Sequence, residues 1–238
     1  LATLFIYDAN SDSWSQGADL PGPGVENPAV VAHNGRIYVF GGSTAPFSGA
    51  VSNAAVYNPA SNSWQTLPSM PTARGGATAQ AVNGLIFVVG GMDNNGGSVS
   101  TVEVFNPGTG TWQSAAGLQT RRDNPGSAVL NGELYVFGGR VRNPDGSSPE
   151  PALSSVEKYS AAGNGWQYMN PMPTGRRAMS VGTANGKVQI LGGEANPNSI
   201  SGVFEQNEEY DATTNSWRSL TKVPTPKHGA ATATIDNK

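Results

Sequence analysis

Basic side chains recur at one place of a repeated unit in this 238-residue sequence. Aligned on an Asn-Gly turn that returns along the chain, this place holds Val25 in the first unit and a cation in each later unit. Guanidinium forks match carboxylates and sulfates, so a ring of such cations would capture an anionic ligand or an acidic peptide. With three neighbours of the repeated position, the predicted ligand-binding residues are Arg74, Arg121, Arg122, Arg176, Arg177, Lys227 and His228.

The same pattern has a structural interpretation. A basic residue that returns in phase with a repeat can belong to the repeat itself and bridge one unit to the next. Replacing Arg122 and Arg176 separates the two hypotheses. Lost ligand binding with unchanged melting indicates capture, whereas a collapse of stability indicates a structural role. On the sequence alone both interpretations stay open.

The sequence lacks the residues that most other kinds of reactive or metal-binding site require. The chain has no Cys, which excludes disulfides, thiolate metal sites and cysteine nucleophiles. It contains neither a Walker-type phosphate loop nor a Gly-x-Ser-x-Gly nucleophile turn. Five carboxylates could pair for acid–base work, although nothing in the sequence brings two of them together: Asp93, Asp123, Asp145, Glu150 and Glu194. We therefore predict no catalytic residue, no metal and no cofactor.

The elements that must hold these residues repeat along the chain. Five Trp recur at intervals of 48 to 54 residues, each seven positions after another aromatic residue. These pairs are Tyr7 and Trp14, Tyr57 and Trp64, Phe105 and Trp112, Tyr159 and Trp166, and Tyr210 and Trp217. Pairs of Gly follow short apolar runs, at Gly41 and Gly42, Gly90 and Gly91, Gly138 and Gly139, and Gly192 and Gly193.

An Asn-Gly pair precedes each apolar run, as Asn34-Gly35 does in the first unit. Asn-Gly accepts the positive φ that a two-residue type I′ hairpin requires, so each unit contains a tight hairpin between its first two strands. The second strand, such as 37–40, is apolar on both faces and therefore needs a packed layer on each side. Sheets stacked around an axis supply those layers.

This ordered set of turn, apolar run, Gly pair, aromatic residue and Trp resembles the kelch repeat over nearly the whole chain. The resemblance implies an all-β, kelch-type β-propeller of about five four-stranded blades, or a segment of a larger propeller. A single domain over 1–238 would hold strands c and d of an incomplete blade in 1–20 and a lone strand a in 222–238 that closes the ring. Complete blades would span 21–68, 69–116, 117–170 and 171–221. The abrupt ends favour a natural gene that is longer than this chain.

Alternating strand directions place the a–b and c–d loops on one face of such a propeller and the d–a and b–c loops on the other. The b–c segments vary in length, the longest being 140–155, so we expect this second face to bind the ligand. His33 and His228 would lie on opposite faces, which excludes a two-His metal site. Aromatic residues that repeat in phase belong in the core between blades, which leaves Phe47 and Phe204 as candidate ligand contacts.

We predict a binding scaffold that recognises a protein or a glycan through the d–a/b–c face. The alternative is an enzyme acting on a small sugar-like substrate at the channel mouth; a spacer domain of a large secreted protein is a third interpretation. Kelch-type propellers include sugar epimerases and copper oxidases similar to galactose oxidase, whose Cys-crosslinked Tyr cannot form without Cys.

Composition bears on partners and location. The net charge of −3 provides no general attraction to nucleic acid, and no apolar stretch is long enough to span a membrane. The Gly-, Ser-, Asn- and Thr-rich, charge-poor composition favours a secreted bacterial protein, although it does not fix the localisation.

Overall fold

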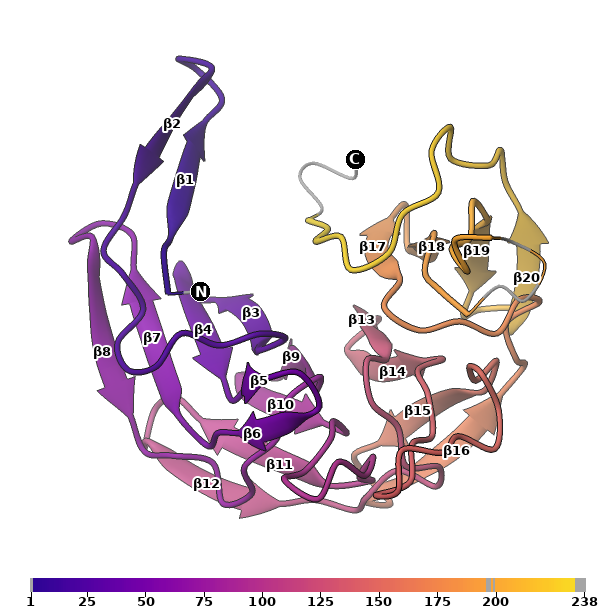
Figure 1. Ribbon diagram of the computed structural model, residues 1–238, viewed down its shortest axis with the longest axis horizontal. Helices are drawn as coiled ribbons and strands as arrows, with labels where there is room; N and C mark the ends of the chain where they lie inside the picture. The colour runs from indigo at the N-terminus through magenta and orange to yellow at the C-terminus, as the bar shows by residue number, and fades with distance from the viewer. Residues whose placement is uncertain (1, 196–197, 199, 234–238) are drawn as a thin grey trace.

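The computed structural model describes residues 2–195, 198 and 200–233, which form an all-β propeller without any helix (Figure 1). None of these residues therefore belongs to a helix that could cross a membrane. Four antiparallel four-stranded sheets follow one another around an axis, and their inner strands contact each other in chain order. The prediction of an all-β propeller with four-stranded blades is confirmed.

We number these sheets blade 1 to blade 4 in chain order. Blade 1 contains β3 (Ala29–His33), β4 (Arg36–Phe40), β7 (Ala54–Asn58) and β8 (Ser63–Leu67). Blade 2 contains β9 (Thr78–Val82), β10 (Leu85–Val89), β11 (Val102–Asn106) and β12 (Thr111–Ser114). Blade 3 contains β13 (Gly126–Leu130), β14 (Glu133–Phe137), β15 (Val156–Ser160) and β16 (Gly165–Met169). Blade 4 contains β17 (Ser180–Ala184), β18 (Lys187–Leu191), β19 (Asn207–Asp211) and β20 (Ser216–Ser219).

A relay of main-chain hydrogen bonds joins the blades near the axis. The N–H of Gly76 donates to the carbonyl of Asn27 (2.9 Å), and the same bond recurs from Asn124 to Gly76 (2.8 Å). It continues from Ala178 to Asn124 (3.0 Å) and from Gly229 to Ala178 (2.8 Å). All five residues have φ between 48° and 64°. Because Gly and Asn tolerate this left-handed region best, they dominate the position.

The repeated aromatic residues fill the layers between consecutive blades. Phe40 of blade 1 meets Phe105 and Trp112 of blade 2 edge-on, with ring centroids 5.9 and 5.4 Å apart. Four of the Trp also donate their indole N–H to a carbonyl at the end of the preceding unit: Trp64 to Ala18, Trp112 to Pro68, Trp166 to Ala116 and Trp217 to Asn170. Each of these Trp is therefore anchored to the unit before its own blade.

The predicted count of about five blades is wrong, because the structure has four. β1 (Phe5–Asp8) and β2 (Ser13–Gln16) pair only with each other, and no strand occurs in 222–233, the described part of the predicted lone strand a. The remaining residues of that prediction, 234–238, lie outside the described chain. Figure 1 shows the β1–β2 hairpin and the C-terminal segment on either side of an open part of the ring.

The fifth aromatic pair also departs from the expected core position. The rings of Tyr7 and Trp14 contact each other at a tilt, with centroids 5.1 Å apart, yet these residues are 48% and 69% exposed. The aromatic pairs of blades 2, 3 and 4 meet Phe40, Phe87 and Phe137 of the preceding blade, and no described blade precedes this hairpin. The C-terminal segment does line the inner strand of blade 4, where Val181 N–H donates to Thr232 Oγ1 (3.2 Å).

Candidate functional site

Three of the predicted cations are buried ion-pair partners within their own blades. Arg74, Arg122 and Arg176 have no exposed surface. Their guanidinium groups pair with a carboxylate on the third strand of the same sheet: Arg74 with Glu103 (2.9 Å), Arg122 with Glu157 (2.5 Å) and Arg176 with Glu208 (2.5 Å). Burial lowers the pKa of each of the three arginines, and the facing carboxylate opposes that shift.

A threonine and main-chain carbonyls complete each pair. Thr72 and Thr174 donate their hydroxyls to Glu103 and Glu208, both at 2.7 Å, and the Thr120 N–H donates to Glu157 at 3.1 Å. We call each set a Thr–Arg–Glu triad. The arginines also donate to carbonyls: Arg74 to Val88 (3.1 Å), Arg122 to Gly138 (2.8 Å) and Ser155 (3.1 Å), and Arg176 to Gly192 (3.1 Å) and Gln206 (3.0 Å).

The triads change the predicted ring of accessible cations. Because the three guanidinium groups are enclosed and paired, they do not reach the channel mouth. The carbonyl of Arg74 accepts a hydrogen bond from Gly42 of the preceding blade (3.0 Å), and those of Arg122 and Arg176 do the same for Gly91 and Gly139. The arginine thus ties its own blade together through its side chain and contacts the preceding blade through its main chain.

Sequence reasoning missed the carboxylates of the triads. Glu103, Glu157 and Glu208 each stand two residues before the repeated aromatic residue of their unit. This phase was available in the sequence. The spacing alone does not show that these carboxylates are buried against an arginine of the same blade.

The other predicted cations lie on the face with the d–a and b–c loops. Arg177 pairs with Glu194 at 3.0 Å, and His228 Nδ1 lies 3.1 Å from the same carboxylate. Arg121 is exposed and donates to the side chain of Asn143 in the long loop after β14. Lys227 is exposed as well, and its carbonyl accepts from Gly193 (2.8 Å).

Three b–c loops converge beside these cations. Phe47, between β5 (Ser43–Ala45) and β6 (Ser48–Ala50), is 54% exposed. The guanidinium carbons of Arg142 and Arg140 lie 4.9 and 5.8 Å from its ring centre. Arg142 also donates to the carbonyl of Gly96 in blade 2 (2.5 Å). Loops of blades 1, 2 and 3 therefore meet through one aromatic ring and two arginines.

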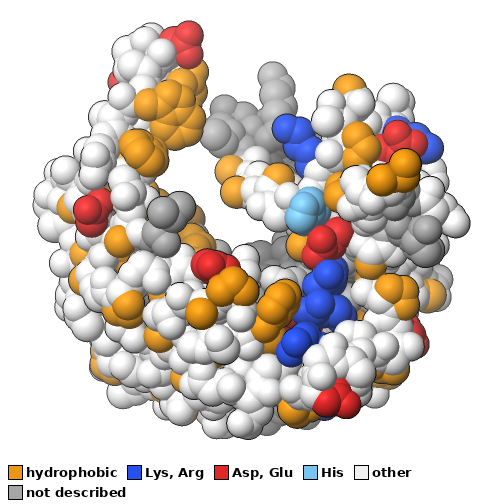
Figure 2. All heavy atoms as spheres, viewed as in Figure 1, with side chains coloured by type: hydrophobic (Ala, Val, Ile, Leu, Met, Phe, Trp, Pro, Cys, Tyr) orange, Lys and Arg blue, Asp and Glu red, His pale blue; other side chains and the backbone are white. Residues whose placement is uncertain are grey.

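We call this group the loop-face cluster: Phe47, Arg121, Arg140, Arg142, Arg177 and His228, with Asp123 and Glu194. Figure 2 shows basic side chains gathered on one face, beside an acidic side chain and a histidine and next to the hollow centre. Asp123 is buried against Arg140 (2.7 Å). Burial, followed by the charge of Arg140, lowers the pKa of Arg177. The buried Nε of Arg177 has no hydrogen-bond partner, so the cluster keeps an unused donor.

The two non-periodic aromatic candidates differ in their exposure. Phe47 belongs to the loop-face cluster, whereas Phe204 is buried.

Within the described residues no group of three or more His, Cys, Asp or Glu could hold a metal ion. His33 ends β3 at the a–b turn, whereas His228 meets Glu194.

The family follows from a model match. Residues 1–143, more than half of the chain, match a family model described as the KLHDC2/KLHL20/DRC7 Kelch-repeats domain. The chain belongs to the kelch-repeat family. A second model, the Kelch motif, matches residues 121–173 of this kelch protein.

Individual relatives are similar over different parts of the chain, and a solved structure shares its fold. Kelch-like protein terF of Aspergillus terreus is 29% identical over 94% of this chain, and Kelch-like protein 40 of Xenopus tropicalis is 27% identical over 89%. An N-acetylneuraminate epimerase of Pasteurella multocida is 34% identical over 34% of the chain. The chain spans 50%, 25% and 23% of these three relatives. The solved structure of YjhT superposes with a TM-score of 0.81 at 17% identity, covering 99% of this chain and 81% of that one.

Proposed function

We propose that this kelch domain is an interaction module that binds an acidic segment of a partner protein through the loop-face cluster. The kelch-like relatives support a protein-interaction scaffold. The observation that carries the proposal is the convergence of three b–c loops on Phe47, Arg140 and Arg142. Long loops that a rigid scaffold holds together in one exposed surface are common sites of ligand binding.

The chemistry of the cluster favours an anion. Its four arginines outnumber its two carboxylates, although the whole chain carries a net charge of −3. Each carboxylate is already held, Asp123 by Arg140 and Glu194 by Arg177 and His228. In the described chain, the side-chain hydrogen bonds of Arg121 and Arg142 go to neutral oxygens, those of Asn143 and Gly96. The hydrogen bonds from Ser147, and then the charge of Arg142, lower the pKa of the nearby Asp145. Replacing a neutral acceptor by a carboxylate strengthens an arginine hydrogen bond.

The test uses an exposed cation on the opposite face as its control. Arg121→Glu and Arg177→Glu reverse charge inside the cluster, and Arg36→Glu reverses it beside the a–b turn of blade 1. A fluorescein-labelled octapeptide of Asp and Glu with one central Phe serves as the probe in anisotropy titrations. We expect each cluster variant to weaken binding about tenfold and the Arg36 variant to leave it within about twofold.

Two results would contradict the proposal. One is no saturable binding of the peptide to the unmodified protein at low salt. The other is an equal loss of affinity in the Arg36 variant, which would show that only net charge matters. Binding to a neutral glycan array with no response to the peptide would favour a glycan as the partner.

The second candidate is an enzyme acting on a sugar-like substrate at the same mouth. The similarity to an N-acetylneuraminate epimerase favours it, and a carboxylated sugar would suit the same arginines. Incubation with N-acetylneuraminate, followed by NMR of the anomeric equilibrium, tests it directly. Acceleration that Arg177→Glu abolishes would favour catalysis, and an unchanged rate of interconversion would oppose it.

A further inference from the structure

Blade 1 lacks the triad that the other three complete blades contain. Counted from the a–b turn, the repeat register places Pro23, Val25 and Ala55 where blade 2 has Thr72, Arg74 and Glu103. The pairing agrees with this register, because Ala55 lies opposite Val39 as Glu103 lies opposite Val88. All three polar members are thus replaced together by residues without a charge or a hydroxyl.

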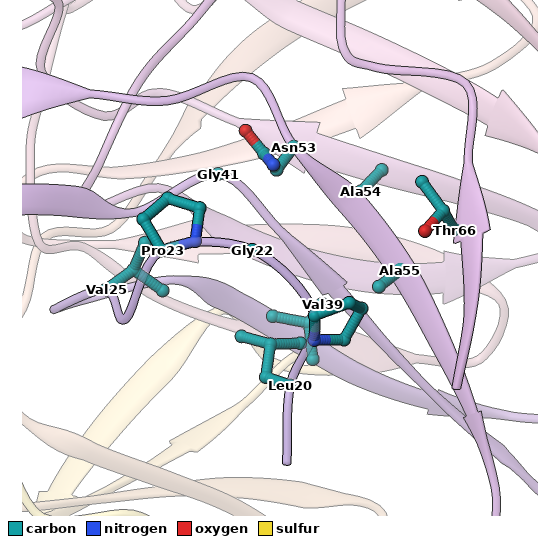
Figure 3. A pocket seen from close by; sticks show the side chains of 11 residues that line it. Leu20, Gly22, Pro23, Val25, Val39, Gly41, Asn53, Ala54, Ala55 and Thr66 are labelled. Atoms are coloured by element: carbon teal, nitrogen blue, oxygen red, sulfur yellow. The ribbon is translucent and has the colours of Figure 1, made fainter. Parts of the chain in front are cut away.

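A cavity occupies the place of the missing side chains. It has a volume of about 150 Å³ and its lining includes Val25, Val39, Gly41, Asn53, Ala55 and Thr66. Figure 3 shows these residues around one space, with Gly22 and Pro23 at its side. Val25 and Ala55 are buried, whereas Gly22, Asn53 and Thr66 are exposed. The cavity therefore has a closed apolar floor and an accessible rim.

The other blades show which atoms face this space. In blade 3 the carbonyls of Gly138 and Ser155 accept from the guanidinium of Arg122. Their counterparts in blade 1 are the carbonyls of Gly41 and Asn53, and the local backbone bond is the same. Gly41 N–H donates to Asn53 at 2.8 Å, as Gly138 N–H donates to Ser155 at 3.0 Å. Two carbonyls that elsewhere serve an arginine thus line the cavity of blade 1 without one.

The polar atoms that line the cavity determine which kind of ligand fits it. A guanidinium or ammonium would find the carbonyls but not the carboxylate, because Ala55 stands in its place, and an unpaired buried charge is costly. A carboxylate would face the two carbonyls, which accept hydrogen bonds and cannot donate to it. A neutral group with several N–H donors satisfies the carbonyls without a buried charge.

We propose that the blade 1 cavity is a binding site for a neutral primary carboxamide or urea group. The N–H donors of that group take the place of the arginine donors of the other blades, and its alkyl part contacts Val25 and Val39. The exposed amide of Asn53 and the hydroxyl of Thr66 line the entrance and can pair with the carbonyl oxygen of the ligand. This site does not depend on the loop-face cluster, so the two proposals stand or fall separately.

The experiment is an NMR titration of the whole chain with propionamide, followed through the backbone amides. We expect saturable shifts at millimolar concentration, confined to Gly41, Asn53, Ala55 and their neighbours. Propionate and propylguanidinium, which have similar size and opposite charges, are the matched probes and should bind at least tenfold more weakly. Absence of saturable shifts with propionamide, or tighter binding of either charged probe, would overturn the proposal.

Three variants test the origin of the site. Val25→Arg/Ala55→Glu rebuilds the ion pair in the cavity and should abolish the propionamide shifts. Ala55→Leu fills the same space without a charge and should do so too, which keeps the test valid if the charged double variant does not fold. Ala55→Glu alone supplies the missing carboxylate and should reverse the preference at least tenfold in favour of propylguanidinium. Unchanged propionamide binding in a folded filling variant would place the ligand elsewhere and contradict the proposal.

Discussion

Blade 1 and blade 3 have the same four-strand meander and the same repeat position before the first strand, yet blade 3 encloses a charged triad and blade 1 a cavity. The comparison shows that the buried ion pair is not required for the blade geometry. Main-chain bonds that both blades share, such as Gly41 N–H to Asn53 and Gly138 N–H to Ser155, maintain the register without it. None of the four blades keeps only one member of the Arg–Glu pair. A buried charge without its partner would be costly.

The largest effect should come from breaking one triad in blade 3. Arg122→Val leaves Glu157, which has no exposed surface, without its cation. We expect the free energy of unfolding to fall by about 3–5 kcal/mol, as for other single-sided losses of buried ion pairs. Urea unfolding measures it. Arg36→Val, at an exposed position of β4, is the control and should change stability by less than about 0.5 kcal/mol. A loss below about 1 kcal/mol for Arg122→Val would mean that water or a rearranged donor reaches Glu157.

Removing both charges converts blade 3 to the blade 1 pattern. Arg122→Val/Glu157→Ala leaves a cavity but no unpaired charge, so most of the lost stability should return. We expect a net loss of about 1–2 kcal/mol relative to the unmodified protein, mainly from lost packing. The same urea series gives the coupling energy between the two sites. If the double variant is no more stable than Arg122→Val, the cost of the single change lies in packing rather than in charge.

The repeated tyrosines of blades 1, 3 and 4 donate a hydrogen bond that Phe105 of blade 2 cannot make, and removing one of these bonds should have a smaller effect. The hydroxyl of Tyr210 donates to the side chain of Asn215 (2.8 Å), and Tyr57 and Tyr159 make the same bond to Asn62 and Asn164. Tyr210→Phe should therefore cost about 1 kcal/mol near neutral pH.

The same variant should change the alkaline stability profile. Burial raises the pKa of Tyr210 from 10.0 to about 12. The unfolded chain then loses this proton first, so the contribution is complete below pH 10 and disappears as the pH rises toward 12. Urea midpoints from pH 8 to 11.5 should converge for the two proteins as the pH rises. Parallel profiles would contradict a protonated, buried phenol as the source of the difference.

Local chemistry explains what could be predicted from the sequence. The turn at Asn34-Gly35 requires positive φ, and both residues adopt it, at 49° and 69°; such signals need no knowledge of distant residues. Predicting where the Arg122 side chain points did require knowledge of distant residues, because its partner Glu157 is 35 positions away in the chain. Blade number and the meeting of Phe47 with Arg142 likewise depend on how separate units stack. The repeat thus predicts the blade, and only the stacked blades show which of its charges are buried.

The smallest expected effect concerns the junction between blades 1 and 2. The side-chain oxygens of Asn62, Asn164 and Asn215 also accept from a backbone N–H of the preceding unit, as Asn62 does from Ala18 (2.8 Å). Blade 2 has Phe105 and Gly110 in place of the Tyr and Asn, and the donor position is Pro68, which has no N–H. Hydroxyl, acceptor and donor are therefore missing together.

Restoring part of this network should stabilise blade 2 slightly. Phe105→Tyr/Gly110→Asn rebuilds the tyrosine bond, and Gly110 already has a φ of +69°, a region that Asn tolerates. We expect a gain of about 0.5 kcal/mol in urea unfolding. Phe105→Tyr alone is the control and should give no gain, because its hydroxyl would lack the Asn acceptor. A gain in the single variant as large as in the double variant would show that Asn is not the partner that makes the repeated tyrosine useful.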